Sequence, residues 1–385
     1  MNARERLQAA LSRKEPDRVP IDLGGIVTGI TTAANQDLKS YLGIRCDDAL
    51  ADRVQQLAVP SESLLQRLRV DTRYLYARAS RDWQDVELAD NCYQDEFGCV
   101  RKAAFAPDGN LLYYDFVSHP LSKIETVGEL AQFKWPDPCD PARFAGLEQA
   151  AREMYEGTGH AILVNLIASI FEFSWYLRGF EPMMHDLLLN KPLAKALLDA
   201  MSEYQIALID GLLSRVGQYL SVVHTGSDLG TQAAPLMSPR LYREMVWPHY
   251  RRLWDFIKGK TGAKIFYHSC GSIVPLIPLL IEGGVDVIHP VQPGATKMGS
   301  KDGERKWLKQ EFGRHIAFWG GFDQQHLLPF GTAAEVREAT RRLLDDFMPG
   351  GGFVFCTGHN IQRGVPPENV LTAYDTVYEY GRYSA

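Results

Sequence analysis

The chain has 385 residues, of which 45% are hydrophobic and 23% charged, and its formal net charge is −6. This composition is ordinary for a globular enzyme with a large core. The acidic balance gives no general attraction to nucleic acid or to an anionic membrane surface. Since no apolar run approaches the roughly 20 residues that span a bilayer, we expect neither a nucleic-acid nor a membrane partner.

Residues 2–13 are typical of a charged amphipathic helix and not of a signal peptide. The six cysteines have no spacing that suggests a disulfide framework, so we expect a protein of the reducing cytoplasm. The next predicted elements are a strand over 19–23, which ends at two glycines, helices over 34–42 and 47–68, and a strand over 70–76.

Residues 77–120 differ from the rest of the chain because they are rich in Asp, aromatic and turn residues. Short alternating stretches surround a strong turn signal, Ala106-Pro-Asp-Gly-Asn110. This pattern predicts an antiparallel hairpin region inserted into the fold and not a second domain. We therefore expect residues 1–385 to form a single domain.

A regular alternation of strands and helices follows the insertion. Such alternation predicts parallel strands with crossover helices, and the two early strands bring the total to eight, the number that closes a barrel. The expected fold is therefore α/β, a (β/α)8 TIM barrel. The later strands are predicted over 161–165, 220–224, 264–268, 285–289, 315–319 and 352–356, and the main helices over 192–214, 239–259, 272–282 and 333–347.

Polar side chains recur where the predicted strands end. In a barrel of this type the active site lies at the C-terminal ends of the strands, so we expect these side chains to meet at one mouth. A His at a strand end also often caps a loop by hydrogen bonding, and that alternative stays open. The residues are Asn165, His224, His268, Cys270, His289, Trp319, Asp323, Cys356, His359 and Asn360.

His268 and Cys270 indicate a metal site. Two residues apart on an extended chain, their side chains point to the same side, and an imidazole with a thiolate suits zinc. A closed barrel can bring Cys356 to the same point, which gives three ligands and an open fourth position, the pattern of catalytic zinc. His359 or Glu172 is a further candidate ligand. The alternative is that Cys356 is a buried strand cysteine.

Two aspartates lie in glycine-bearing loops that follow predicted strands. Asp228 lies in His224-Thr-Gly-Ser-Asp-Leu-Gly230, and Asp323 ends Trp319-Gly-Gly-Phe-Asp. Because glycines let backbone approach a ligand closely, each carboxylate is a candidate for substrate orientation or proton transfer. The alternative for each is an Asp that caps the next helix. We expect Asp228 and His224 to be catalytic.

Short motifs occur along nearly the whole chain. They are Pro16-Asp-Arg-Val-Pro20, Leu177-Arg-Gly-Phe180, Ser227-Asp-Leu-Gly230 with Met237-Ser-Pro239, His268-Ser-Cys-Gly271, Ile288-His-Pro-Val-Gln-Pro293, Phe318-Trp-Gly-Gly-Phe-Asp323 and His359-Asn-Ile-Gln362 with Val365-Pro-Pro-Glu-Asn369. Together they resemble the uroporphyrinogen decarboxylase superfamily. This resemblance implies the family's barrel, which agrees with the independent count of eight strands.

The resemblance implies one of two chemistries. The decarboxylases of the superfamily bind a polyanionic porphyrinogen with arginines and an aspartate in the N-terminal region, without a metal. Residues 24–36, after the first predicted strand, contain no Arg or Lys, although a substrate with many carboxylates needs such cations. Decarboxylation is therefore the alternative here, with Arg73, Arg101 or Arg178 as possible sources of charge. A non-catalytic ligand-binding barrel is a further alternative.

The other branch of the superfamily comprises cobalamin-linked methyltransferases. It implies zinc held by a His-x-Cys pair and a distant Cys, a pattern that His268, Cys270 and Cys356 match. These enzymes move methyl groups between small methylated compounds, a corrinoid and a thiol or folate. Since the chain has no D-x-H-x-x-G corrinoid-binding signature, we expect the corrinoid (cobalamin) to be carried by a separate partner protein.

We therefore expect a zinc-dependent, corrinoid-linked methyltransferase, and the sequence does not specify its oligomeric state. An aromatic pocket from Phe171, Trp175, Tyr267 and Trp319 suits an O-methylated aromatic ether as the methyl donor, with removal of the methyl group as the preferred direction. The other expected substrate contacts are Asn165, Glu172, His289, Asp323, His359 and Asn360.

Overall fold

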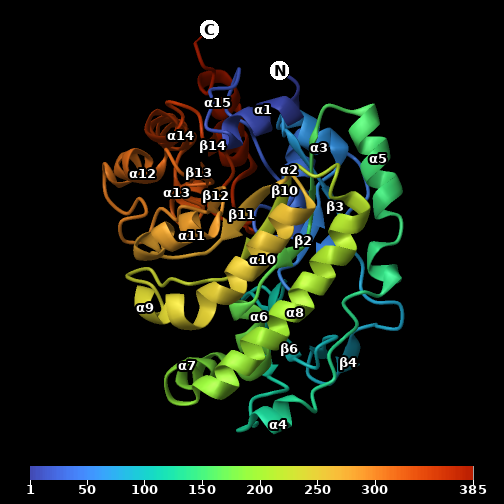
Figure 1. Cartoon of the computed structure of the whole chain (residues 1–385). Helices are drawn as coiled ribbons and strands as arrows, with labels where there is room; N and C mark the ends of the chain where they lie inside the picture. Colours follow the sequence, from blue (N-terminus) through green and yellow to red (C-terminus); the bar gives the residue numbers. More distant parts are fainter. Residues whose placement is uncertain (385) are drawn as a thin grey trace.

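The structure, a computed structural model, describes residues 1–384. Its largest sheet has six parallel strands in the order β14-β13-β12-β11-β10-β9, so strands that follow one another in the chain are also neighbours in the sheet. Helices lie outside the sheet, and the two chain termini lie at one end of the molecule (Figure 1). The strands are β9 (Ile167–Ala168), β10 (Val222–Gly226), β11 (Lys264–His268), β12 (Val287–His289), β13 (Ala317–Trp319) and β14 (Phe353–Val354).

A second parallel pair consists of β3 (Thr72–Leu75) and β8 (Ala161–Val164). It lies beside the six-stranded sheet, because Ser221, which precedes β10, donates its N–H to the carbonyl of Ile162 at 2.9 Å. The predicted α/β class with parallel strands is therefore confirmed, and it is consistent with a barrel of the TIM type.

The predicted ring of eight regular strands is not closed by continuous ladders within residues 1–384. Segment 19–23 forms single contacts instead of a strand: Ile21 has one parallel bridge to Phe355, and its carbonyl accepts the N–H of Asp71 at 2.8 Å. Pro20 lies in the middle of this segment and has no N–H to donate. A proline there prevents a regular ladder on that side.

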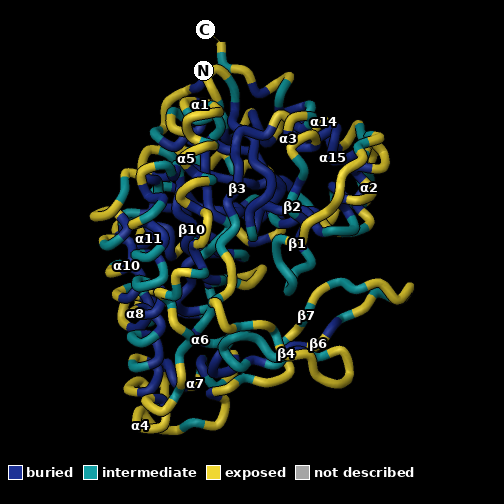
Figure 2. Tube along the Cα trace, turned by 90° about the vertical axis from the view of Figure 1, so that its right-hand side faces the viewer, coloured by how far each residue is buried: buried dark blue, intermediate teal, exposed yellow. Residues whose placement is uncertain are grey.

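The predicted insertion is present as a four-stranded antiparallel sheet in the order β4-β5-β6-β7. Figure 2 shows this sheet apart from the buried parallel strands and close to α6. Its exposed outer side and half-buried inner side follow the alternation of the strand residues. The strands are β4 (Val86–Leu88), β5 (Cys92–Gln94), β6 (Val100–Phe105) and β7 (Leu111–Ser118).

The helix predicted over 47–68 is wrong for most of its length. The chain forms an antiparallel pair there, β1 (Ala49–Asp52) and β2 (Leu57–Val59), and the helix α3 (Glu62–Arg67) begins only after Pro60. Ser61 caps this helix by accepting the N–H of Leu64 at 3.3 Å. The proline and the serine cap fix the start of the helix at this point.

The remaining helices follow the predicted alternation. Helix α14, for example, begins at a capping box in which Thr332 and Glu335 satisfy each other's backbone N–H groups. The helices are α1 (Ala3–Leu11), α2 (Thr32–Leu42), α4 (Val127–Leu130), α5 (Leu147–Gly157), α6 (Phe171–Arg178), α7 (Phe180–Leu189), α8 (Lys191–Val216), α9 (Pro239–Leu241), α10 (Trp247–Lys260), α11 (Ile277–Gly283), α12 (Glu304–Phe312), α13 (Leu327–Phe330), α14 (Ala333–Phe347) and α15 (Pro367–Tyr380), with short 3-10 or π turns at Pro141–Phe144, Tyr242–Val246 and Val274–Leu276.

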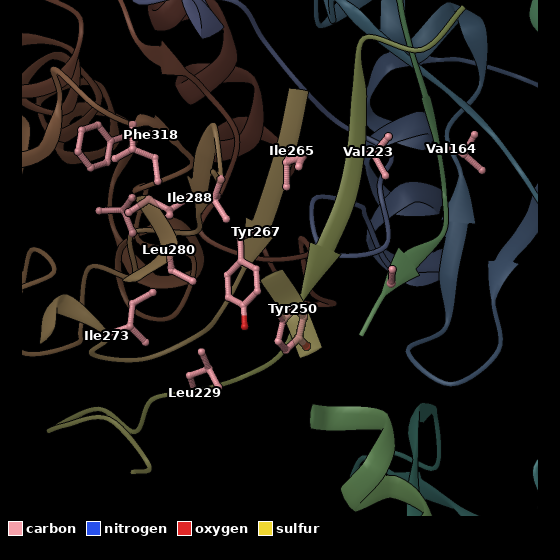
Figure 3. Packing of buried hydrophobic residues seen from close by; sticks show 14 of the residues in the cluster. Val164, Val223, Leu229, Tyr250, Ile265, Tyr267, Ile273, Leu280, Ile288 and Phe318 are labelled. Carbon is pink, nitrogen blue, oxygen red and sulfur yellow. The ribbon is translucent and has the colours of Figure 1, made fainter. Parts of the chain in front are cut away.

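Successive residues of the parallel strands bury opposite faces of the sheet. Val223, Ile265 and Ile288 pack toward Tyr250 and Leu280 of the surrounding helices (Figure 3). The residues next to them on the strands point to the other face and form a separate inner cluster, which includes Val222, Phe266, Val287 and Cys356. This two-sided burial makes the strands a rigid frame for the loops at their ends. No helix within residues 1–384 is long and apolar enough to cross a membrane.

Candidate metal centre

Two histidines lie side by side at the ends of neighbouring strands. The parallel register places Gly226, His268 and His289 at one level of β10, β11 and β12. His268 and His289 are almost fully buried, and their Nδ1 atoms are 2.8 Å apart. One ring must donate its Nδ1 proton to the other. If His268 donates, its Nε2 is free to bind a ligand on the opposite side of the ring.

His268, Cys270 and His359 form a group that could hold a metal ion. Their ligand atoms all lie within 4.8 Å of one another, and Cys270 Sγ is 3.7 Å from His268 Nε2. The chain turns sharply after Cys270 because Gly271 has φ +84°, and a Cβ there would meet the backbone of Gly230 at 2.4 Å. Only glycine fits this turn, which directs the thiol toward the histidines.

Two carboxylates support this group. Asp228 Oδ1 accepts the backbone N–H of Cys270 at 2.7 Å and lies 3.5 Å from His268 Nε2. Glu172 accepts the N–H of Asp228 at 3.4 Å on one oxygen and the hydroxyl of Tyr176 at 2.6 Å on the other. Hydrogen bonds of this kind orient ligand side chains and fix the loop that carries them.

The pKa values of these two acids are shifted in opposite directions. Burial, and then the charge of Asp228, raises the pKa of Glu172 to about 7. Burial alone would also raise the pKa of Asp228, but the hydrogen bond and charge of His268 lower it below its usual value. A carboxylate beside a protonatable acid is an arrangement that can accept and return a proton near neutral pH.

The ligand group itself is poorly ionised without a cation. Burial, and then the charge of His268, lowers the pKa of His359 to about 4. Burial, and then the charges of Asp228 and Glu172, raises the pKa of the Cys270 thiol well above its usual value. A neutral imidazole is ready to bind a metal, whereas the thiol loses its proton only when a cation binds beside it.

A cavity of about 650 Å³ opens over this group, and Cys270 and His359 are part of its lining. Carboxamide side chains dominate the other walls, and one of them, Gln292, accepts the N–H of Gly271 at 2.6 Å. Exposed Phe330 lies at the rim. The lining carboxamides are Gln232, Gln292, Gln324, Gln325, Asn360 and Gln362.

Cys356 is not part of the ligand group. Its side chain is fully buried in the inner cluster of the strands, and its thiol donates to the carbonyl of Thr357 at 3.0 Å. Burial, and then the charge of Asp22, raises the pKa of this thiol well above its usual value. The structure therefore corrects the predicted triad, because His359 and not Cys356 lies beside His268 and Cys270.

The predicted aromatic pocket is not assembled as a cavity. Phe171, Tyr267 and Trp319 are fully buried core residues. Trp319 donates its Nε1–H to Asp22 at 3.1 Å, and Tyr267 packs edge-on against Tyr250. Trp319 belongs to the inner cluster of the strands, and Phe171 and Tyr267 belong to the cluster between the strands and the helices. Close packing in both clusters leaves no room for a ligand ring.

Trp175 and Asn165 are half-buried away from the ligand group. Trp175 packs edge-on against Phe180, with ring centroids 5.6 Å apart. Asn165 follows β8 and leaves its side-chain oxygen without a partner among the described residues. Neither residue lines the cavity over His359.

Asp323 and Asn360 make hydrogen bonds within the fold, whereas His224 makes none among the described residues. Both ring nitrogens of His224 are buried without a hydrogen-bond partner in residues 1–384, and burial lowers the pKa of this imidazole to about 3. Asp323 accepts the N–H groups of Gln325 and His326, which is the capping role weighed against function. The Asn360 side chain accepts the N–H of Gly29 and donates to the carbonyl of Ile26, which joins two distant loops. Asn360 is also part of the cavity lining.

Sequence reasoning missed Tyr176 and Gln292. Tyr176 stands four residues after Glu172 in α6, the spacing that places two side chains on one helix face. Gln292 follows His289 by three residues in the loop after β12, a position where polar residues of such folds approach a ligand. Both spacings can be seen in the sequence, but the contacts that make these two residues part of the site can be seen only in the structure.

Comparisons with known proteins agree with this architecture. A family model described as uroporphyrinogen decarboxylase (URO-D) matches residues 117–380. The uroporphyrinogen decarboxylase of Neisseria meningitidis serogroup C is 24% identical over 237 residues, which cover 58% of this chain and 60% of that protein. The methylated-thiol–coenzyme M methyltransferase of Methanosarcina mazei is 25% identical over 246 residues, which cover 62% of this chain and 59% of that protein.

A solved structure of a methyltransferase from Methanosarcina mazei has a similar fold, with a TM-score of 0.67 at 16% identity. The superposition covers 99% of each chain. The sequence matches to the two curated relatives, by contrast, span only 60% and 59% of their lengths. The likeness therefore extends over the whole fold, while detailed sequence agreement is confined to part of it.

Proposed function

The chain belongs to the uroporphyrinogen decarboxylase (URO-D) family, and from this premise we propose that it is a zinc-dependent methyltransferase. In this proposal it moves a methyl group between a small methylated compound and a separate corrinoid protein, with a thiol or folate as the other possible carrier. The single observation that carries the proposal is the group of His268, Cys270 and His359, of which Cys270 and His359 line an open cavity.

The donor set fits zinc. Two imidazoles and one thiol are ligands that zinc prefers, and three protein ligands leave a fourth position for a substrate atom. A tetrahedral site with bonds of about 2.0–2.3 Å places its ligand atoms roughly 3.3–3.8 Å apart. Cys270 Sγ and His268 Nε2 are 3.7 Å apart, and all three ligand atoms lie within 4.8 Å of one another, so a small movement of His359 would complete the geometry. Zinc bound here would act as a Lewis acid that lowers the pKa of a bound thiol.

The chain's own residues would prepare this chemistry. His289 would hold the His268 ring with its Nε2 toward the metal, and Asp228 would fix the Cys270 loop through its backbone N–H. Glu172, with a pKa of about 7, would take the proton released when a thiol binds or return it to a leaving group. The half-buried carboxylate of Asp228 would favour a cationic or metal-bound ligand over an anion.

The corrinoid partner and the substrate are inferred at the level of class. One relative is named as a methyltransferase for methylated thiols, which supports methyl transfer to or from sulfur as one reaction to test. The open cavity and the exposed ring of Phe330 at its rim provide a contact for a partner protein that brings its own cofactor. An O-methyl aromatic ether loses its structural support, because three of the four rings predicted to bind it lie in the core.

Decarboxylation is the second candidate, since several similar proteins are named uroporphyrinogen decarboxylases. A polyanionic substrate needs free cations, yet Arg73 pairs with Glu62 and Arg178 pairs with Asp186. Of the described residues that line the cavity over His359, only Arg363 is cationic. The charge balance of this cavity therefore favours methyl transfer.

We also propose that the barrel is closed and that the chain forms one domain. The bridge from Ile21 to Phe355, the hydrogen bond from Asp71 to Ile21 on the other side, and the likeness to a whole methyltransferase chain support a closed eight-stranded barrel that forms one domain. We assign the protein to the cytoplasm on the basis of family membership, which stays a prediction that localisation of the tagged chain would test.

A methyl-transfer assay tests the proposal. Purified zinc-loaded protein would be mixed with reduced cobalamin and a panel of methylated thiols, ethers and onium compounds, and methylation of the corrinoid would be followed by absorbance. We expect at least one compound to react with the wild type and not with Cys270→Ala. Carbon dioxide release from a porphyrinogen by both proteins, with no corrinoid methylation, would instead establish a decarboxylase.

A further inference from the structure

A second cavity, of about 290 Å³, lies under the inserted antiparallel sheet. Its walls come from the β1–β2 hairpin, from β5 and β6, and from the helices α6 and α8. None of the described residues that line it also lines the cavity over Cys270. It is therefore a separate space, large enough for one small organic molecule.

Aromatic rings form much of this wall, and their faces attract cations. Two of the rings already have a cation nearby: the Arg53 guanidinium is 3.9 Å from the Tyr93 centroid, and that of Arg101 is 5.5 Å from the Tyr176 centroid. The other three rings have no arginine or lysine of residues 1–384 over their faces. The lining rings are Trp83, Tyr93, Phe97, Phe173 and Tyr176.

The charge of the wall is also negative in balance, with four carboxylates against two guanidiniums. Asp85 pairs with Arg53 at 3.1 Å, Asp95 with Arg101 at 3.2 Å, and Glu96 with an arginine outside the wall. Asp52 forms no ion pair in the described chain; it accepts the backbone N–H of Gln55 at 2.6 Å and also that of Val54, with the charge of Arg101 nearby. The unpaired carboxylate favours a cationic ligand and opposes an anionic one.

We propose that this cavity binds a small methylated cation, a quaternary ammonium or sulfonium group on a short chain. Such a cation has no N–H to donate, so ring faces and one unpaired carboxylate hold it better than a set of hydrogen-bond acceptors would. A primary ammonium needs three acceptors, and Asp85 and Asp95 are already engaged with arginines. A neutral aromatic ligand would gain nothing from the Asp52 carboxylate, which has no ion-pair partner of its own in the described chain.

The cavity is connected to the metal centre by one side chain. Tyr176 lines the cavity with its ring, and its hydroxyl donates to Glu172 at 2.6 Å. Glu172 in turn accepts the N–H of Asp228, whose carboxylate holds the Cys270 loop. The proposed cation site does not depend on a bound metal. The role of the bound cation, as a methyl donor or as an effector of methyl transfer, rests on the proposed function.

Isothermal titration of the full chain tests the binding site. The probes are choline, its uncharged isostere 3,3-dimethyl-1-butanol, and benzoate. We expect choline to bind about 10-fold more tightly than the alcohol, because only the cation gains from the ring faces and from Asp52. Equal binding of the two isosteres, tighter binding of benzoate, or no heat with choline would overturn the proposal.

Two variants test whether choline binds beside Asp52. Asp52→Asn keeps the shape and the bond from Gln55 N–H, and we expect it to weaken choline binding about 10-fold. The matched control is Asp115→Asn on the exposed side of β7, which should bind choline as the wild type does. A wild-type affinity in Asp52→Asn would overturn the assignment, as would an equal loss in the control.

Cys270→Ala separates this proposal from the proposed function. We expect this variant to bind choline with unchanged affinity although it loses the metal. Loss of choline binding would place the cation at the metal centre and overturn the second site. If the wild type binds choline but no zinc, the cavity assignment survives and the metal mechanism fails.

Discussion

The two cavities are built by different parts of the chain and by different physical means. The cavity over Cys270 lies at the ends of β10, β11 and β12, where the register of parallel strands fixes the level of each side chain. The cavity under the insertion is lined by rings from a hairpin, an antiparallel sheet and two helices, with arginines between them. In our proposals the first cavity supports metal binding and proton transfer, and the second binds a small methylated cation.

The largest expected effect is that of Cys270→Ala, which removes the thiol of the ligand group. Loss of one of three ligands should lower zinc affinity by more than about 100-fold, since even partners of ligands contribute 10–100-fold. Zinc content after dialysis against a weak chelator measures the effect. Wild-type zinc content in this variant would remove the thiol from the site.

His289→Leu should lower zinc affinity less, by about 10–100-fold. The variant leaves all three ligands in place but removes the partner 2.8 Å from His268 Nδ1. Competition with a fluorescent zinc chelator gives the affinity, and choline titration serves as the control that should not change. If zinc affinity stays at the wild-type value, His289 does not orient the ligand ring.

Glu172 should make the metal-free protein less stable as the pH rises. Its pKa is raised from 4.5 to about 7 in the folded chain, so the folded state holds the proton more tightly than the unfolded state. The free energy of unfolding should therefore fall between about pH 4.5 and pH 7, by at most about 1.4 kcal/mol per pH unit.

Urea titrations across this range measure the dependence, with Glu172→Gln as the matched control that cannot titrate. The difference between the two proteins isolates Glu172 from the other acids. A difference that is constant with pH, or that grows in the opposite direction, would contradict the raised pKa.

The smallest expected effect is that of Tyr176→Phe, which removes the hydrogen bond between the two regions. The loss should cost about 1 kcal/mol of stability. Because the hydroxyl lowers the pKa of Glu172, its removal should move the pH dependence of transfer to higher pH. An unchanged pH profile would mean that the two cavities act independently at this point.

The sequence predicted the part of the site that depends on strand register. A strand that ends at His268, with Cys270 two residues on, follows from local pattern, and so does the alternation that makes the sheet parallel. The antiparallel insertion was predicted from its turns and composition. These features depend on residues that are close in the chain.

The remaining features depend on contacts between distant segments. Cys356 and His359 both follow the last strand, and local pattern cannot tell which of them turns toward β11; the buried inner cluster takes Cys356, and the loop after it brings His359 across. Three of the four rings predicted to form a substrate pocket, Phe171, Tyr267 and Trp319, are part of the core instead. The strand expected over 19–23 failed as a regular ladder because of one proline.

Zinc content in two variants tests the central assignment most directly: His359→Ala beside Cys356→Ala, both measured by mass spectrometry with the wild type. The account predicts about one zinc per chain in the wild type and in Cys356→Ala, and a strongly reduced content in His359→Ala. The reverse result, with zinc lost in Cys356→Ala and kept in His359→Ala, would contradict the ligand group described here.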